Sequence, residues 1–164
     1  MMMAAVYLQP TDVGLIDGFT YEDISSHENV AIAAPLAFGD SFQGAPVVGT
    51  TADFVEHLAN GEIEGRLWEA TYEGIAGADV PLEIGSEFEP AHGVGDVVDE
   101  GAHAGAAIRV VGRMSRTGSP WDKAIMVPVE SVWEVHGLAM ATRQSGSTNS
   151  AHPSTRASSL AHPP

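Results

Sequence analysis

The sequence predicts an α+β fold, a single domain in which short helices pack on one face of a mixed β-sheet. Short apolar runs alternate with short amphipathic segments, and some of the apolar runs follow each other with only a turn between them. A doubly wound parallel sheet would instead show a helix after every strand. The length of 164 residues is typical of one domain and is enough to bury a core.

The first expected elements are a helix and a strand. Thr20 and Asp23 form a capping-box pattern, and Phe19 is placed to pack on Ile24 as a hydrophobic staple, so we expect a helix of about two turns that ends near residues 27–29. An apolar strand should follow over residues 30–38, interrupted by a proline that suits an edge or a bulge.

Turn residues and apolar helix faces predict the elements between residues 39 and 105. Gly39–Asp40 should turn or bulge the strand, and Thr50 with Asp53 repeats the capping pattern before a second helix, which Asn60–Gly61 should end. The other expected elements are strands at 41–42, 46–48 and 72–76, a short helix or turn at 77–82, and a solvated glycine-rich loop at 92–105.

Residues 108–138 carry the strongest local pattern in the chain. Ile108–Val111 and Ala124–Val127 are typical of two strands, and Thr117–Pro120 supplies turn residues between them. We therefore expect a hairpin or a tight strand connection. Pro128 suits the first position of a helix, and residues 129, 132, 133 and 136 then fall at helical spacing, which predicts a short amphipathic helix.

The same stretch, VVGRMSRTGSPWDKAIMVPVESVWEVHGL, resembles the end of the extracytoplasmic domain of FtsX-like, MacB-type ABC transporter permeases. Upstream, HENVAIAAPLAFGDSFQGAPVVGTT and GRLW are similar in order to segments of those permeases. The resemblance implies a MacB-like core domain over residues 20–138, preceded by an N-terminal strand or leader segment at 1–19. In the family this domain lies on the periplasmic face of the inner membrane, between the first transmembrane helix and the remaining three.

The resemblance also implies a function without bond chemistry. Paired domains of a permease dimer are moved by their transmembrane helices when a cytoplasmic ABC ATPase subunit binds and hydrolyses ATP, and a substrate is exported or released outside the membrane. The implied partners are the ATPase subunit, a second permease protomer and an extracytoplasmic partner, with no cofactor and no catalytic residue.

Composition excludes several function classes. Twenty-two acidic and seven basic residues give a formal charge of −15, which disfavours binding to nucleic acid or anionic lipid. The chain contains no cysteine, so disulfides and thiolate metal sites are excluded. It shows no signal peptide and no apolar run long enough for a transmembrane helix. In the permeases, transmembrane helices anchor this domain at both ends. We therefore expect that the sequence is a fragment, truncated on both sides before those helices.

Residues 139–164 differ in composition from the rest. They contain two arginines, no acidic residue and many Ser, Ala, Pro and Thr, which predicts a disordered tail. Family members continue after His-Gly-Leu with an Asn-Gly-His-like motif, and those codons read one base later can encode Met140–Thr142. We therefore expect a frameshift after Leu138; the alternative is a natural flexible tail.

The only set with metal-ligand types in plausible number is His92, His103 and His136, with Asp96, Asp99 and Glu100 between the first and the last of them. Their spacing matches no preorganised site and the segments are glycine-rich, so solvated loop histidines are the favoured interpretation. The alternative function is a free-standing metal-binding or chaperone-like protein that uses this loop.

For most of the other polar and aromatic residues that could act in a site, the sequence favours a structural role. Asp40 is expected to stabilise a turn, and Asp122 to hold the loop before the second strand of the 108–138 stretch. Trp121 is the candidate for a partner contact and Trp133 is expected in the core, while Trp68 could be either. His27 and His57 are expected as helix-end caps, and Ser41, Ser119 and Ser131 lie in no nucleophile motif.

Overall fold

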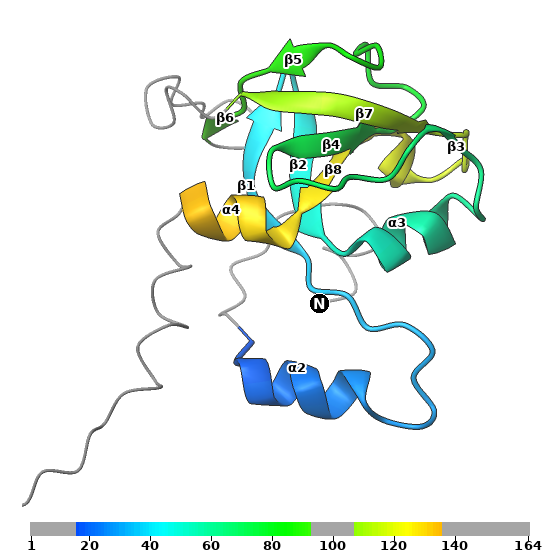
Figure 1. Ribbon diagram of the computed structural model, residues 1–164, viewed down its shortest axis with the longest axis vertical. Coiled ribbons are helices and arrows are strands. Elements are labelled where there is room, and N and C mark those ends of the chain that lie inside the picture. Colours follow the sequence, from blue (N-terminus) through cyan, green and yellow to red (C-terminus); the bar gives the residue numbers. More distant parts are fainter. Residues whose placement is uncertain (1–15, 93–106, 136–164) are drawn as a thin grey trace, which may run out of the picture.

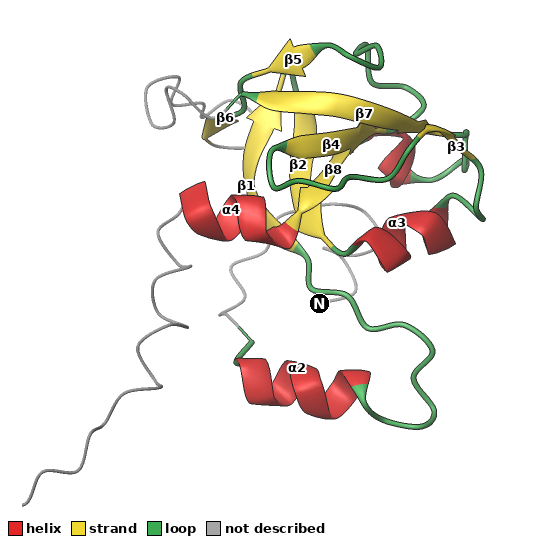
Figure 2. Cartoon of the chain, viewed as in Figure 1, coloured by secondary structure: helices red, strands yellow, loops and turns green. Residues whose placement is uncertain are grey.

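The described residues form an eight-stranded mixed sheet and three α-helices, of which the one at residues 18–25 lies apart from the sheet (Figures 1 and 2). The computed structural model describes residues 16–92 and 107–135. This architecture confirms the predicted α+β class. The expectation that the helices pack on one face is wrong, because Val55 of the helix at residues 52–58 and Val132 of the helix at 129–135 belong to apolar clusters on opposite faces of the sheet. In chain order the elements are α2 (Gly18–Ser25), β1 (Ala37–Phe42), β2 (Ala45–Thr50), α3 (Ala52–Leu58), β3 (Ile63–Gly65), β4 (Glu73–Ala76), β5 (Glu87–Phe88), β6 (Ala91–His92), β7 (Ile108–Met114), a 3-10 helix (Pro120–Lys123), β8 (Ile125–Pro128) and α4 (Val129–Val135).

The strand order is β3-β7-β4-β8-β2-β1-β6, with β5 also paired to β7. Two pairs are parallel, β2 with β8 and β4 with β7, and the others are antiparallel. The predicted strand, turn, strand and helix of residues 108–135 are all present. The hairpin is wrong, however, because β4 lies between β7 and β8 and pairs with both. The connection is tight, but it passes over one strand.

Two apolar clusters fill the two faces of the sheet, because successive residues of a strand point to opposite sides. In β8, Ile125 and Val127 belong to one cluster and Met126 to the other, and all three side chains are 0% exposed. A strand buried on both faces is a continuous apolar run rather than an alternating one. The run that the sequence marked as a strand is therefore a central one.

The N-terminal part differs most from the prediction. The N-cap of α2 is Asp17 and not Thr20, because the Asp17 carboxylate accepts hydrogen bonds from the Thr20 N–H at 2.9 Å and from its hydroxyl at 2.8 Å. Phe19 is 85% exposed, so the hydrophobic staple is wrong. The strand expected from Val30 begins only at Ala37.

The predictions for residues 39–82 are largely confirmed, whereas those for the N-terminal segment, the glycine-rich loop and the C-terminal tail fall mainly outside the described residues. The register of β1 shifts between Ala37 and Asp40, as expected for a bulge. Asn60–Gly61 ends α3 with φ of 51° and 75°. The N-cap of α3 is Thr51, one residue later than predicted, because Thr50 completes β2. Residues 77–82 form turns without a helix, and the Arg113 guanidinium donates to four carbonyls there, those of Gly77, Ala78, Val80 and Leu82.

The chain enters β1 and leaves β8 at the same end of the sheet (Figure 1). Ala37 pairs with Gly49 of β2, and Gly49 pairs with Val127 of β8, one residue before the end of that strand. Helix α4 then packs across this end: a Cβ on Gly49 would lie 2.7 Å from a Val132 methyl group and 3.2 Å from the Ala37 Cβ. Glycine is therefore required there for α4 to approach the sheet.

Candidate functional site

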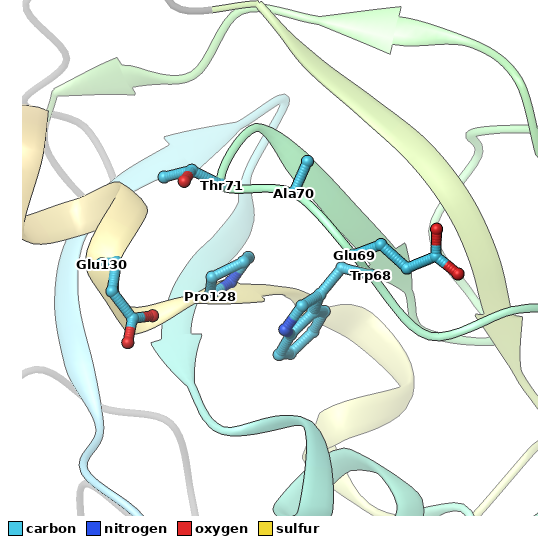
Figure 3. A pocket seen from close by; sticks show the side chains of 6 residues that line it. All are labelled: Trp68, Glu69, Ala70, Thr71, Pro128 and Glu130. Carbon is cyan, nitrogen blue, oxygen red and sulfur yellow. The ribbon is translucent and has the colours of Figure 1, made fainter.

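A hollow of about 260 Å³ lies between the β3–β4 connection and the junction of β8 with α4. Figure 3 shows that the Trp68 ring and the Glu130 carboxylate flank Pro128 at its floor, whereas the Glu69 carboxylate points away. The hollow is lined by Trp68, Glu69, Ala70, Thr71, Pro128 and Glu130.

The first wall of the hollow is fixed by Glu73. Its carboxylate accepts two hydrogen bonds from the Arg66 guanidinium, at 2.8 and 2.5 Å, and further bonds from the backbone N–H groups of Glu69 at 2.8 Å and Ala70 at 3.3 Å. The bonds from Arg66 and from the Glu69 backbone lower the pKa of Glu73 from 4.5 to about 2, and the pKa of Arg66 is raised in turn. Both ends of the connection are thus clamped in one geometry.

The second wall, α4, is bonded to the first. The buried Ser131 hydroxyl donates to the Thr71 carbonyl, and the Tyr72 hydroxyl donates to the Glu134 carboxylate at 3.1 Å. Partial burial raises the pKa of Tyr72, and the bond to Glu134 adds to that shift. These two bonds fix the spacing between α4 and the β3–β4 connection, and therefore the width of the hollow.

The structure describes only one of the three histidine candidates. His92 lies in β6, opposite Asp40 of β1, while His103 and His136 fall outside the described residues. Within residues 16–92 and 107–135, no group of three or more His, Asp or Glu side chains is placed to hold a metal ion. A metal site that includes His103 and His136 stays a prediction.

The expectations for two tryptophans are wrong, and in opposite directions. Trp121, the candidate for a partner contact, is 5% exposed, and its ring meets Phe54 edge-on at 5.3 Å. The 3-10 turn folds this ring back onto α3. Trp133, expected in the core, is 38% exposed because Val129 and Val132 occupy the inner face of α4. Trp68 is partly buried, and it lines the hollow.

Asp122 has the predicted structural role. Its carboxylate accepts hydrogen bonds from the Thr117 N–H, the Thr117 hydroxyl and the Gly118 N–H, each at 2.8 Å. Burial of Asp122 opposes its ionisation, but the bonds from Thr117 and Gly118 prevail and lower its pKa. Asp40 is buried inside β1, so it lies in a strand and not in a turn.

The other proposed polar residues have local contacts. His57 is in the last turn of α3, as predicted for a cap. His27 directly follows Ser26, the C-cap of α2, and its Nδ1 accepts a hydrogen bond from the Asn29 N–H at 3.2 Å. Ser119 shares a 2.6 Å hydrogen bond with the Thr117 hydroxyl, and Ser41 is buried in β1.

The sequence did not predict the hollow. It also did not predict the Arg66–Glu73 pair that fixes one wall or the hydrogen bonds that join the two walls. The motif at 65–68 was informative only as a resemblance, and nothing local connected Trp68 with Glu130, which is 62 residues later in the chain. Arg66 and Glu73 are seven residues apart, which is too far for a helical pair and gives no recognisable turn pattern. A loop rich in aromatic and acidic residues, RLWEATYE, was the available signal.

Helices in the described ranges are too short to cross a membrane as apolar spans. A scan of the chain against protein-family models and a search of curated proteins both returned no match.

Proposed function

We propose that the chain is the extracytoplasmic domain of an FtsX-like, MacB-type ABC transporter permease. In this proposal it performs no bond chemistry, and it couples ATPase-driven motion of membrane helices to the export or release of a substrate. The observation that carries the proposal is the resemblance of residues 108–138, in which strand, turn, Pro-Trp-Asp, strand and helix occur in the order of the permease domain.

The position of this stretch in the fold supports the proposal. β8 pairs with β2 and β4, and its residues 125–127 are fully buried. Asp122 organises the turn that leads into it. The residues that carry the resemblance are thus the ones on which the sheet depends, as expected where a sequence signature reflects a shared fold.

The way the chain enters and leaves the sheet also supports the proposal. β1 begins beside Gly49 and α4 packs against the same glycine, so the two connections meet at one end of the sheet. Domains inserted into a larger protein commonly have their two connections close together. This geometry suits a domain held at two points by neighbouring membrane helices.

The packing of α4 supports a mechanical role. Val132 is buried in the sheet cluster, Ser131 is bonded to Thr71, and Glu134 to Tyr72. Protein interiors are close-packed, so a displaced helix moves its neighbours as a unit. A push on α4 would therefore reach both the sheet and the β3–β4 connection.

Cell fractionation tests the proposal. An antibody raised against residues 16–135 should detect, in the source cells, a membrane-bound polypeptide longer than 164 residues. The epitope should be accessible from outside the inner membrane, and an ATP-hydrolysing subunit should co-purify with the polypeptide from detergent extracts. A polypeptide of 17.1 kDa confined to the soluble fraction would contradict the proposal.

A further inference from the structure

We propose that the hollow between Trp68 and Glu130 binds an arginine or lysine side chain that a partner protein presents. The inference rests on the proposed function, because it names the chemistry by which the extracytoplasmic domain would recognise its partner.

The two groups that flank the floor favour a cation. The Trp68 ring and the Glu130 carboxylate lie on either side of Pro128 (Figure 3). A guanidinium or ammonium group seated beside Pro128 would have the Trp68 indole on one side and the Glu130 carboxylate on the other, and both groups attract cations. Thr71 and Ala70 also line the hollow, and they add no charge.

No positive charge of the described chain occupies this place. The lining contains no basic residue, and in residues 16–92 and 107–135 no basic side chain forms an ion pair with Glu130. Arg66, the basic residue nearest to Trp68 in the sequence, is paired with Glu73. With a formal charge of −15 over the chain, an incoming cation is also attracted from a distance.

The size and the rim of the hollow favour a protein partner. At about 260 Å³ it is smaller than the hollows that enclose whole drug-sized ligands, and it suits one side chain. Tyr72 and Trp133, which are 41% and 38% exposed, lie next in sequence to Thr71 and Glu134, the residues that join the two walls. Trp and Tyr are enriched among the residues that dominate protein–protein binding energy.

The walls are already fixed without a ligand. The Arg66–Glu73 pair holds one wall, and the Ser131–Thr71 and Tyr72–Glu134 bonds join it to the other. A side chain that enters would therefore not need to order the loop, which reduces the entropic cost of binding.

A peptide titration tests the inference on the purified chain. The probe is a capped hexa-arginine peptide, followed by calorimetry and by tryptophan fluorescence, with capped hexa-glutamine as the uncharged comparison. We expect one saturable site, and we expect Glu130→Gln to weaken the binding about two- to fivefold. Trp68→Leu should weaken it about two- to tenfold.

The matched control is Glu83→Gln, which removes the same single charge from an exposed residue outside the hollow. It should change the affinity by less than about 1.5-fold because distant surface charges are screened. Equal weakening by Glu83→Gln and Glu130→Gln would overturn the inference, since it would indicate general attraction of a polycation to an acidic protein. Binding of arginine amide as tight as that of the peptide would also overturn it, in favour of a small-cation site.

Trp68 packs against the core, so Trp68→Phe is measured beside Trp68→Leu, and the urea midpoint of each is checked. If both fail to fold, the exposed Glu130 variant decides the outcome. The peptide titration and the cell fractionation can fail independently, so loss of the binding site is distinguishable from loss of the proposed function.

Discussion

The closing segment, residues 108–135, and the N-terminal segment, residues 16–36, both contain helices with recognisable sequence signals, yet they contribute very differently to the fold. α2 has a well-formed N-cap at Asp17 and no buried residue. α4 is shorter, but it places Val129 and Val132 against the sheet and follows the fully buried β8. Capping and spacing indicate that a helix forms; only burial makes it part of the core.

The difference also explains which residues the sheet depends on. β8 lies between β4 and β2 and contributes to both apolar clusters, whereas α2 joins β1 through a segment without helix or strand that includes Pro35. We therefore expect the same kind of substitution to lower the free energy of unfolding more in the closing segment than in the N-terminal segment.

The largest effect should come from the core of the closing segment. Ile125→Ala removes a side chain that is 0% exposed and leaves a cavity, so the free energy of unfolding should fall by about 2–5 kcal/mol. Phe19→Ala removes a larger side chain that is 85% exposed and should change it by less than about 0.5 kcal/mol. Urea denaturation followed by circular dichroism measures both. Similar losses in the two variants would refute the contrast.

The second effect concerns two aspartates that accept local hydrogen bonds. Asp122→Ala leaves the N–H groups of Thr117 and Gly118 without their acceptor in a turn that leads into β8, which should cost about 2–3 kcal/mol. Asp17→Ala should cost α2 about 1 kcal/mol of local helix stability. Because α2 buries nothing, the urea midpoint should not move.

Hydrogen exchange separates these two cases. Asp17→Ala should speed amide exchange in α2 alone, and Asp122→Ala should speed it across the sheet. If Asp17→Ala lowers the global midpoint as much as Asp122→Ala does, α2 is part of the cooperative core and the comparison is wrong.

A smaller effect is expected from the acid dependence of the Arg66–Glu73 pair. The pKa of Glu73 is about 2 in the folded protein, below its ordinary 4.5, so the folded state binds this proton less readily than the unfolded state. The stabilisation is therefore complete above about pH 4.5, and it is lost as the pH falls toward 2. The stability difference between the wild type and Glu73→Gln, measured by urea midpoints, should be constant at neutral pH and shrink in that acid window. A difference that grows on acidification would contradict the assigned pair.

The predictable parts of this molecule are the local ones. The turn at Asp122 could be inferred because its partners lie four and five residues away, and the end of α3 because Asn60–Gly61 adopts positive φ values. The strand order could not be inferred from the sequence. β4 lies between β7 and β8 in the sheet, although it precedes β7 by more than thirty residues in the chain.

Almost none of the candidate site could be predicted from the sequence, because it depends on contacts between residues that are far apart in the chain. Ser131 and Thr71, which join its walls, are 60 residues apart, and Tyr72 and Glu134 are 62 apart. The two tryptophan assignments failed for a related reason: whether a helical or turn residue faces inward depends on which neighbours fill the core first. The Trp121 ring packs against Phe54 of α3. On α4, Val132 faces the core and Trp133 is exposed.

The nucleotide sequence that follows the codon of Leu138 tests the central claim most directly. If the chain is a permease domain, another reading frame should encode apolar segments of about 20 residues, long enough to span a membrane, and a gene for an ABC ATPase should lie beside it. An early stop codon in every frame, with no apolar segment and no ATPase gene nearby, would contradict the account.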